Sequence, residues 1–161
     1  MQMISDSNTR IVIAGPQDLT AIHDVFRKAI QNTNARDYTP EQLEVWLGSA
    51  NDRQRWLRKL EHQYFILART NNIVAGFASL ENHSYIDLMY VHPDHAGKGI
   101  GTQLVSHIEN VARARGVRKL AADVSITATA FFRKKGFLID HRNERIIKGV
   151  EIINYRMSKQ L

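Results

Sequence analysis

The segment from Tyr85 to Val124 constrains the fold more than any other part of the chain. It reads as a strand (YIDLMYV, 85–91), a loop with three alternate glycines (HAGKGIG, 95–101), a helix, and a second strand (KLAADV, 119–124). The helix is indicated by an apolar stripe at helical spacing, formed by Leu104, Val105, Ile108, Val111 and Ala112. Two strands joined through one helix pair in parallel by a right-handed crossover. The segment therefore predicts an α/β fold.

The flanking segments predict further strands and helices in the order βααβββαβαββ, in which the helical region 43–60 is counted once. We expect a strand at 10–15, a hairpin of 64–69 and 72–80 that turns at Asn71-Asn72, and closing strands at 137–142 and 150–157. We expect helices at 19–31 with Asp18 as N-cap, in the region 43–60 as two short helices that start after Thr39-Pro40, and at 127–135. The sheet is then largely antiparallel around one parallel pair.

Length and composition predict one soluble domain over residues 1–161. The chain is 43% hydrophobic, which is enough for a core, and no internal repeat, low-complexity tract or Pro/Gly/Ser linker marks a domain boundary. The longest apolar run, IVAGFASL, is too short to cross a bilayer. The chain has no cysteine, and its polar start MQMISDSNTR is unlike a secretion signal. We therefore expect a cytoplasmic protein that does not bind membranes.

The positive charge is concentrated in the C-terminal third. Residues 1–112 carry 10 Lys/Arg and 12 Asp/Glu, whereas residues 113–161 carry 12 and 4, and the whole chain has a net charge of +6. Nucleic acid, an anionic membrane surface or a phosphorylated small molecule would each fit such a surface. A solvated basic surface without a partner explains the charge equally well.

The glycine loop predicts a phosphate site. It runs into a helix N-terminus, where unpaired backbone amides and the helix dipole favour an anion. The sequence lacks the Gly-Lys-Ser/Thr of a P-loop and the glycine spacing of a dinucleotide fingerprint. A tight turn with close helix packing is the alternative interpretation.

The stretch LMYVHPDHAGKGIGTQLVSHIENVARARG, followed by SITATAFFRKKGF, resembles the acetyl-CoA signature of the GCN5-related N-acetyltransferases (GNAT). The order of elements is also similar to that of this family. The resemblance implies a mixed, mostly antiparallel sheet flanked by helices, with a central βαβ unit that binds acetyl-CoA. It implies an acyltransferase that moves an acetyl group from acetyl-CoA to a primary amine of a small molecule or protein, by direct attack in a ternary complex.

The resemblance also assigns residues to the cosubstrate. The main chain of Met89, Tyr90 and Val91 would align the pantetheine arm and polarise the thioester carbonyl. Ala96 stands where the family usually has Gln or Arg, which removes one side-chain contact. The loop amides would hold the pyrophosphate, and they belong to Gly97, Lys98, Gly99, Ile100, Gly101 and Thr102.

A second motif follows, in which the family often has Asn, Ala, Tyr and Gly-Phe at fixed spacing. Here Ser125 and Phe132 replace the Asn and the Tyr, while Ala128 and the pair Gly136-Phe137 match. Ser125 can still bond a pantetheine amide, but Phe132 cannot supply a proton. Phe131 and Phe132 line the cosubstrate or pack in the core. In the cluster RKK (133–135), Lys134 would meet the ribose 3′-phosphate, with nucleic acid as the alternative partner.

The chemistry requires a base for the amine and an acid for the leaving thiolate. Asp87 is the only ionisable side chain inside its strand and shares strand parity with Met89 and Val91, so we expect it at the thioester as the base. An ion pair with a neighbouring basic group is the alternative role for Asp87. Glu81, His83 or a water are the other candidates for the base. Tyr90 and Tyr155 are the candidate acids.

Other features support weaker expectations. His92 and His95 lack a third ligand other than Asp94, so we assign no metal. Tyr38 and Trp46 lie on the segment that in this family covers the acceptor pocket, although core packing would also explain Trp46. A coenzyme-binding regulator and a basic nucleic-acid-binding module are the alternative functions, and a homodimer is left open. The acceptor cannot be read from the sequence.

Overall fold

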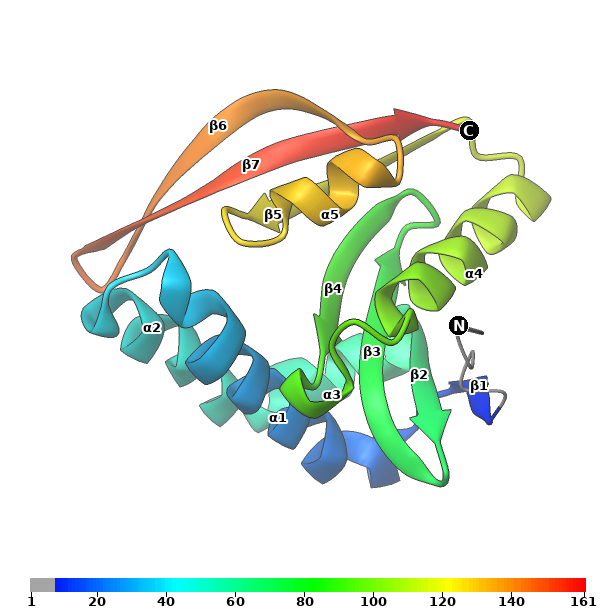
Figure 1. The fold of residues 1–161 in the computed structure, drawn as a ribbon, viewed down its shortest axis with the longest axis horizontal. Helices are drawn as coiled ribbons and strands as arrows, with labels where there is room; N and C mark the ends of the chain where they lie inside the picture. The colour runs from blue at the N-terminus through cyan, green and yellow to red at the C-terminus, as the bar shows by residue number, and fades with distance from the viewer. Residues whose placement is uncertain (1–7) are drawn as a thin grey trace, which may run out of the picture.

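The computed structural model describes residues 8–161, so the polar N-terminal stretch up to residue 7 lies outside the described residues. Figure 1 shows one curved sheet with helices on both faces. The strands are β1 (Thr9–Ile13), β2 (Tyr64–Thr70), β3 (Ile73–Glu81), β4 (Tyr85–Val91), β5 (Lys119–Ser125), β6 (Leu138–Ile147) and β7 (Val150–Gln160). The α-helices are α1 (Leu19–Lys28), α2 (Pro40–Leu47), α3 (Arg53–His62), α4 (Ile100–Ala114) and α5 (Thr129–Lys134).

Within residues 8–161, seven strands form a single sheet in the order β1-β2-β3-β4-β5-β7-β6. The strands β4 and β5 pair in parallel, and every other neighbouring pair is antiparallel. The helix α4 makes the crossover between the two parallel strands (Figure 1). The predicted fold class, with its central βαβ unit, is therefore confirmed. In the part of the chain that the structure describes, no helix has the length and apolar character needed to cross a bilayer.

Local sequence signals explain most of the turns and helix ends. Asn71 and Asn72 both take positive φ at the tip of the β2–β3 hairpin, as this turn type requires. The Thr39 hydroxyl accepts a hydrogen bond from the Gln42 amide, and the Gln42 side chain accepts one from the Thr39 amide, so a capping box starts α2. The helix α4 ends before Gly116, which has a φ of +78°.

One prediction about the first helix was confirmed and one was wrong. Asp18 occupies the N-cap position of α1, as predicted, although its side chain makes no cap bond, because its carboxylate accepts hydrogen bonds from the Gly15 amide at 2.9 Å and from Arg69 at 2.7 Å instead. The helix does not stop at the polar stretch that follows residue 31. It continues through a π-helical turn (Ala29–Thr33) and a 3-10 turn (Asn34–Arg36), which carry Asn34 into the protein interior.

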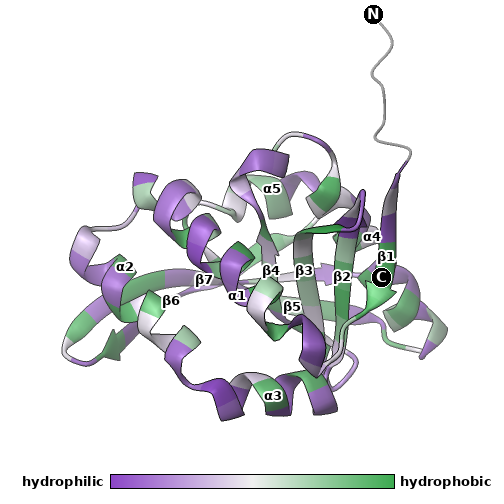
Figure 2. Cartoon of the chain, turned by 90° about the horizontal axis from the view of Figure 1, so that it is seen from below, coloured by the Kyte–Doolittle hydropathy of each residue, from purple (hydrophilic) through white to green (hydrophobic). Residues whose placement is uncertain are grey.

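Apolar side chains form a separate core on each face of the sheet. The α4-side core joins the apolar stripe of α4 to β2–β5 and to Phe132, Phe137 and Met157. The α1-side core joins α1 and α3 to the opposite face of β2 and β3, around Phe26 and Trp56. In Figure 2, α3 lies on one side of the sheet and α5 on the other. The α1-side core does not extend over β5, β6 or β7 within the described residues.

A β-bulge in β4 changes the expected orientation of Asp87. Ser79 pairs with Leu88 but Leu80 pairs with Ile86, so Asp87 is an extra residue in the strand. Ile86 and Met89 both pack in the α4-side core, whereas Asp87 bonds to side chains of α3 on the other face. The prediction that Asp87 shares a face with Met89 and Val91 was therefore wrong, since strict alternation fails at a bulge.

The sheet opens in its middle. The strands β4 and β5 pair only at Tyr85 with Ala121 and at Ile86 with Ala122. Beyond these two pairs the strands diverge, and the ends of β4 and β5 lie apart in Figure 1. The opening leaves the later residues of both strands facing a cavity.

Candidate active site

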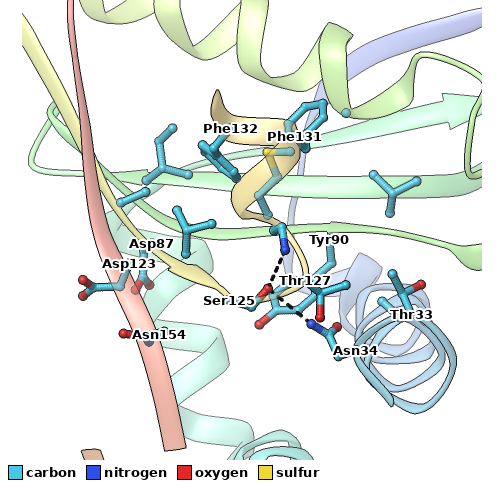
Figure 3. Close-up of a pocket in the computed structure, with 18 of the residues that line it drawn as sticks. Thr33, Asn34, Asp87, Tyr90, Asp123, Ser125, Thr127, Phe131, Phe132 and Asn154 are labelled. Carbon is cyan, nitrogen blue, oxygen red and sulfur yellow. Dashed lines mark hydrogen bonds between the residues drawn. The ribbon is translucent and has the colours of Figure 1, made fainter. Parts of the chain in front are cut away.

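A cavity of about 700 Å³ occupies the opening between β4 and β5. One part is lined by the glycine loop, the start of α4, the end of β5 and α5. The other part is lined by residues of the α1–α3 region and of β4–β7, including Tyr38, Arg55, Asp87, Asp123 and Arg145. We call these parts the loop side and the acceptor side of the cavity. Figure 3 shows side chains from both parts.

The glycine loop presents open backbone to the cavity. Gly97 and Gly99 have φ values of +76° and +81°, and a Cβ at either position would meet no atom within 4 Å. The amides of Ile100, Gly101 and Thr102 occupy the first turn of the 15-residue helix α4, where helix geometry leaves them without an intrahelical partner. An unobstructed loop at the positive end of a long helix fits the pyrophosphate of a coenzyme.

Gly101 has a different reason to be glycine. A Cβ at this position would lie 3.0 Å from the Phe131 ring and 3.5 Å from the Met89 methyl group. The start of α4 therefore packs closely against α5 and β4. The open backbone at Gly97 and Gly99 is compatible with the anion-site interpretation, whereas Gly101 fits the interpretation of close helix packing.

Most residues assigned to the cosubstrate line the cavity, and Lys98 and Lys134 do not. Phe132 is also a core residue, only 4% exposed, and packs edge to face on Phe137 at 5.1 Å. Phe131 is half-buried beside it. The lining residues of this set are Met89, Tyr90, Val91, Gly97, Gly99, Ile100, Gly101, Thr102, Ser125, Ala128, Phe131 and Phe132.

A polar cluster lies where β5 ends, and it joins the predicted Ser125 to two residues that sequence reasoning missed, Asn34 and Thr127. Asn34, which is 6% exposed, donates a hydrogen bond from its Nδ2 to the Ser125 Oγ at 3.3 Å, and Ser125 accepts another from the Ala128 amide. The Thr127 Oγ1 is buried beside them without a hydrogen-bond partner in the described part of the chain. Figure 3 shows the three side chains together on the cavity wall. They give the cavity polar groups for a ligand, and no periodicity in the sequence marks Asn34.

Asp87 lies on the acceptor side and forms an ion pair with Lys59 of α3. Both Lys59 and Gln63 donate to the same carboxylate oxygen, Oδ2, with Gln63 at 2.9 Å. Among residues 8–161, no side chain donates a hydrogen bond to the other oxygen, Oδ1. The ion pair was the alternative role for Asp87, and it leaves one oxygen free to accept a proton.

Asp123 is a second acceptor-side carboxylate, and its side chain is only 7% exposed. It accepts hydrogen bonds from Tyr85 at 2.8 Å, from Asn143 at 2.8 Å, from Arg145 at 3.0 Å and from two nitrogens of Arg156. Burial alone would raise the pKa of Asp123, but the hydrogen bonds from Arg156 and Tyr85 outweigh it and hold the pKa below its usual value. With both oxygens occupied, Asp123 holds side chains in place.

The sequence contained a signal for Asp123. Asp87 was selected because it is the only acidic residue inside an apolar strand, and the same criterion applied to KLAADV selects Asp123. The two carboxylates lie on the same part of the cavity wall in Figure 3.

The two candidate acids differ in position. Tyr90 lines the cavity within an aromatic cluster that includes Phe26, Phe77 and Trp46. Burial raises the pKa of Tyr90 well above its usual value, so the phenol stays protonated at neutral pH. Tyr155 packs against the α4-side core and is not a lining residue, because alternation along β7 directs its neighbour Asn154 to the cavity instead.

The other residues that the sequence singled out differ in whether they line the cavity. Glu81 and His83 are not lining residues of the cavity. Tyr38 and Trp46 do line it, with ring centroids 5.2 Å apart. The Tyr38 hydroxyl also donates to the Ile153 carbonyl at 2.8 Å. Across residues 8–161, no three potential metal ligands lie together, including those around His92.

Comparisons with known proteins agree with this geometry. The family model described as an acetyltransferase (GNAT) domain matches residues 34–159. The uncharacterized N-acetyltransferase YafP of Escherichia coli K12 is 28% identical over 151 residues, which cover 94% of this chain and 95% of YafP. These similarities give no support to a nucleic-acid-binding module.

Two solved structures share the fold. A GCN5-related N-acetyltransferase from Rhodopseudomonas palustris, also named a class-II aminotransferase, has a TM-score of 0.95 and 34% identity, and the alignment covers 100% of both chains. The PaiA N-acetyltransferase of Thermoplasma acidophilum, solved with coenzyme A, has a TM-score of 0.78 and 20% identity over 95% of this chain and 99% of its own. Together with the family match over most of the sequence, the glycine loop and the divided sheet identify this chain as a member of the GNAT family of acetyl-CoA-dependent acyltransferases.

Proposed function

We propose that the chain acetylates a primary amine by direct attack in a ternary complex, with Asp87 as the base. The observation that carries this proposal is the free Oδ1 of Asp87 in the same cavity as the glycine loop. Asp123 is less suited to the role because its hydrogen bonds already occupy both oxygens. The absence of cysteine from the sequence argues against a covalent thiol intermediate and fits a cytoplasmic location.

The base is useful because an alkylammonium with a pKa of about 10.4 is only about one part in a thousand neutral at pH 7. Asp87 accepts the proton of the acceptor ammonium, either directly or through a water, and the neutral nitrogen can then attack. Lys59 and Gln63 both donate hydrogen bonds to Oδ2 and so hold the carboxylate in place.

Bound acetyl-CoA supplies the thioester carbonyl, at which a C–N bond forms and the C–S bond breaks. The loop amides and the Ser125 hydroxyl bind and orient the cosubstrate, and the backbone of Met89, Tyr90 and Val91 lies at the opening of the sheet to polarise the carbonyl. The Tyr90 hydroxyl donates a hydrogen bond to the leaving sulfur. Because burial raises the pKa of Tyr90, full transfer of its proton to a thiolate is unfavourable. The acceptor nitrogen becomes positively charged when the C–N bond forms, and it supplies the proton to the leaving thiolate.

Gly99→Asp is expected to weaken acetyl-CoA binding about tenfold or more, which corresponds to about 1.4 kcal/mol. The new carboxylate lies at the N-cap of α4, where it competes with the phosphates for the helix amides. Titration calorimetry with acetyl-CoA measures the change. Unchanged affinity would mean that the phosphates bind elsewhere.

Two control variants separate charge and strain from binding. Gly99→Asn adds a side chain of the same size without the charge, so it should weaken binding less than Gly99→Asp. Gly116→Asp creates a carboxylate at a glycine with nearly the same φ, +78°, at the far end of α4. Its affinity for acetyl-CoA should equal that of the wild type.

The double variant Arg133→Glu with Lys134→Glu tests the predicted contact with the ribose 3′-phosphate. Both residues are exposed in the last turn of α5. We expect the variant to weaken the binding of coenzyme A more than the binding of dephospho-coenzyme A, which lacks that phosphate. The control Arg118→Glu with Lys119→Glu makes the same charge change at two exposed residues at the start of β5, the end of the strand opposite to α5. An equal loss of affinity for both ligands would show that the α5 cations act only through the electrostatic field of the whole protein.

A further inference from the structure

The charges of the acceptor side restrict what amine it can hold. The charged lining residues there are Arg55, Asp87, Asp123 and Arg145. Both carboxylates already have cationic partners within residues 8–161, because Asp87 pairs with Lys59 and Asp123 with Arg145 and Arg156. Neither carboxylate is therefore an unpaired anion that would recognise a second ammonium on the acceptor.

The two lining arginines keep donors for a ligand. Arg145 uses one nitrogen, Nη2, to bond Asp123 at 3.0 Å, and its side chain is 56% exposed. Arg55 is exposed and has no ion-pair partner in the part of the chain that the structure describes. A guanidinium carries five donors in a planar fork that matches a carboxylate. The charged lining residues and their direct ion-pair partners can be counted among the described residues. They comprise four cations, Arg55, Arg145, Lys59 and Arg156, and two carboxylates, Asp87 and Asp123.

The excess of positive charge on the acceptor side lies apart from the glycine loop and α5, where the coenzyme is proposed to bind. Arg55 belongs to α3, whose Trp56 and Leu60 pack in the α1-side core. The glycine loop precedes α4, whose apolar stripe packs in the core on the opposite face of the sheet. Arg55 and the glycine loop are therefore on different faces of the sheet.

We propose that the acceptor is a small amine that also carries a carboxylate, as a free amino acid does, and that Arg145 and Arg55 bind this carboxylate. The inference rests on the proposed acetyl transfer and names its substrate class. Arg145 is positioned by Asp123, which is fixed in turn by Arg156 and Tyr85. The rings of Tyr38 and Trp46 give the cavity an uncharged wall for the rest of the acceptor. A polyamine, with a second ammonium, would be repelled.

The test compares each amino acid of a panel, with small, aliphatic and aromatic side chains, with its own carboxamide. The kcat/KM for acetylation is measured by release of free coenzyme A. The carboxamide has the less basic amine, so more of it is neutral and chemistry alone favours the amide. We expect the wild type instead to prefer the amino acid by about tenfold or more, the usual scale of hydrogen bonds to a charged group.

Variants of the two arginines test whether these residues cause the preference for the amino acid over its carboxamide. Arg145→Gln and Arg55→Gln should each reduce the preference for the amino acid, mainly through KM, and Arg145→Lys should retain part of it. Arg142→Gln is the matched control, since Arg142 lies on the same strand β6, is similarly exposed at 51%, pairs with Glu144 and does not line the cavity. Its preference should equal that of the wild type.

The outcomes separate the two proposals. If the wild type acetylates carboxamides or diamines as well as amino acids, the carboxylate inference is wrong and acetyl transfer stands. If the preference exists but survives in both Arg145→Gln and Arg55→Gln, these arginines do not bind the carboxylate. If calorimetry shows acetyl-CoA binding but no amine in the panel is acetylated, the acceptor class is wrong. If amines outside the panel, including protein amines, are not acetylated either, the proposed acetyl transfer is wrong as well.

Discussion

Asp87→Asn is expected to lower kcat by about 10²-fold or more, the usual contribution of a general base. The carboxamide cannot accept the proton that Oδ1 receives, while the dissociation constant for acetyl-CoA should barely change because Asp87 lies on the acceptor side. The deficit should shrink as the pH rises toward the pKa of the acceptor amine, since more of the amine is then neutral. A pH profile of kcat for both proteins measures this.

A control is needed because Asp87 also ties β4 to α3 through Lys59. Lys59→Met breaks the same ion pair but keeps the carboxylate and its bond to Gln63. Lys59→Met should therefore retain most of the activity. Equal losses in the two variants would show that the ion pair matters and the base does not. Full activity of Asp87→Asn at every pH would leave a water as the base, since Glu81 and His83 lie outside the cavity lining.

Asp123→Asn is expected to lower the free energy of unfolding by about 2 kcal/mol, because the carboxylate is buried while its partners Arg145 and Arg156 are partly exposed, which screens the ion pairs. For a domain of this size the loss corresponds to a fall in Tm of about 4–8 °C. The variant removes the charge that Arg156 and Arg145 share and leaves the buried network without an anion. Asp140→Asn is the control, because Asp140 is exposed and accepts one bond from Ser158, so its change should stay within about 0.5 kcal/mol.

The pH dependence of this effect has a defined sign. The pKa of Asp123 is lower in the folded protein than in the unfolded chain. Its contribution to stability is therefore complete above the unfolded value of about 3.9 and is lost as the pH falls through the lower folded value. The difference in unfolding free energy between wild type and Asp123→Asn should be constant near neutral pH and should narrow below about pH 4. A difference that widens in acid would contradict the assignment.

Periodicity and turn chemistry were sufficient for the order of elements. The alternate apolar residues of β5, the stripe of α4 and the Asn71-Asn72 turn are local signals, and they predicted the crossover and the hairpin. The glycines at 97 and 99 predicted the open loop because their positive φ is a local requirement.

The acceptor side was not predictable in the same way. Asp123 meets Tyr85, Arg145 and Arg156 only after strands far apart in the sequence pair, and Asn34 reaches Ser125 across 91 residues. The bulge at Asp87 depends on how β3 and β4 align, so strand alternation assigned the wrong face. These contacts depend on tertiary structure that a one-dimensional pattern does not contain.

The unequal coverage of the sheet has a consequence for local unfolding. The strands β2 and β3 are enclosed by a core on each face, whereas β6 is an edge strand with mostly exposed side chains, and the α1-side core stops before β5. Segments with few buried contacts open at lower free energy, so amides of β6 should exchange with solvent much earlier than those of β3. We therefore expect Arg145 to lie in a segment that opens more easily than β3, whereas the glycine loop leads into α4, whose apolar stripe is buried. If the loop binds the phosphates as proposed, the β6–β7 hairpin would then adjust to acceptors of different shape without loosening that loop.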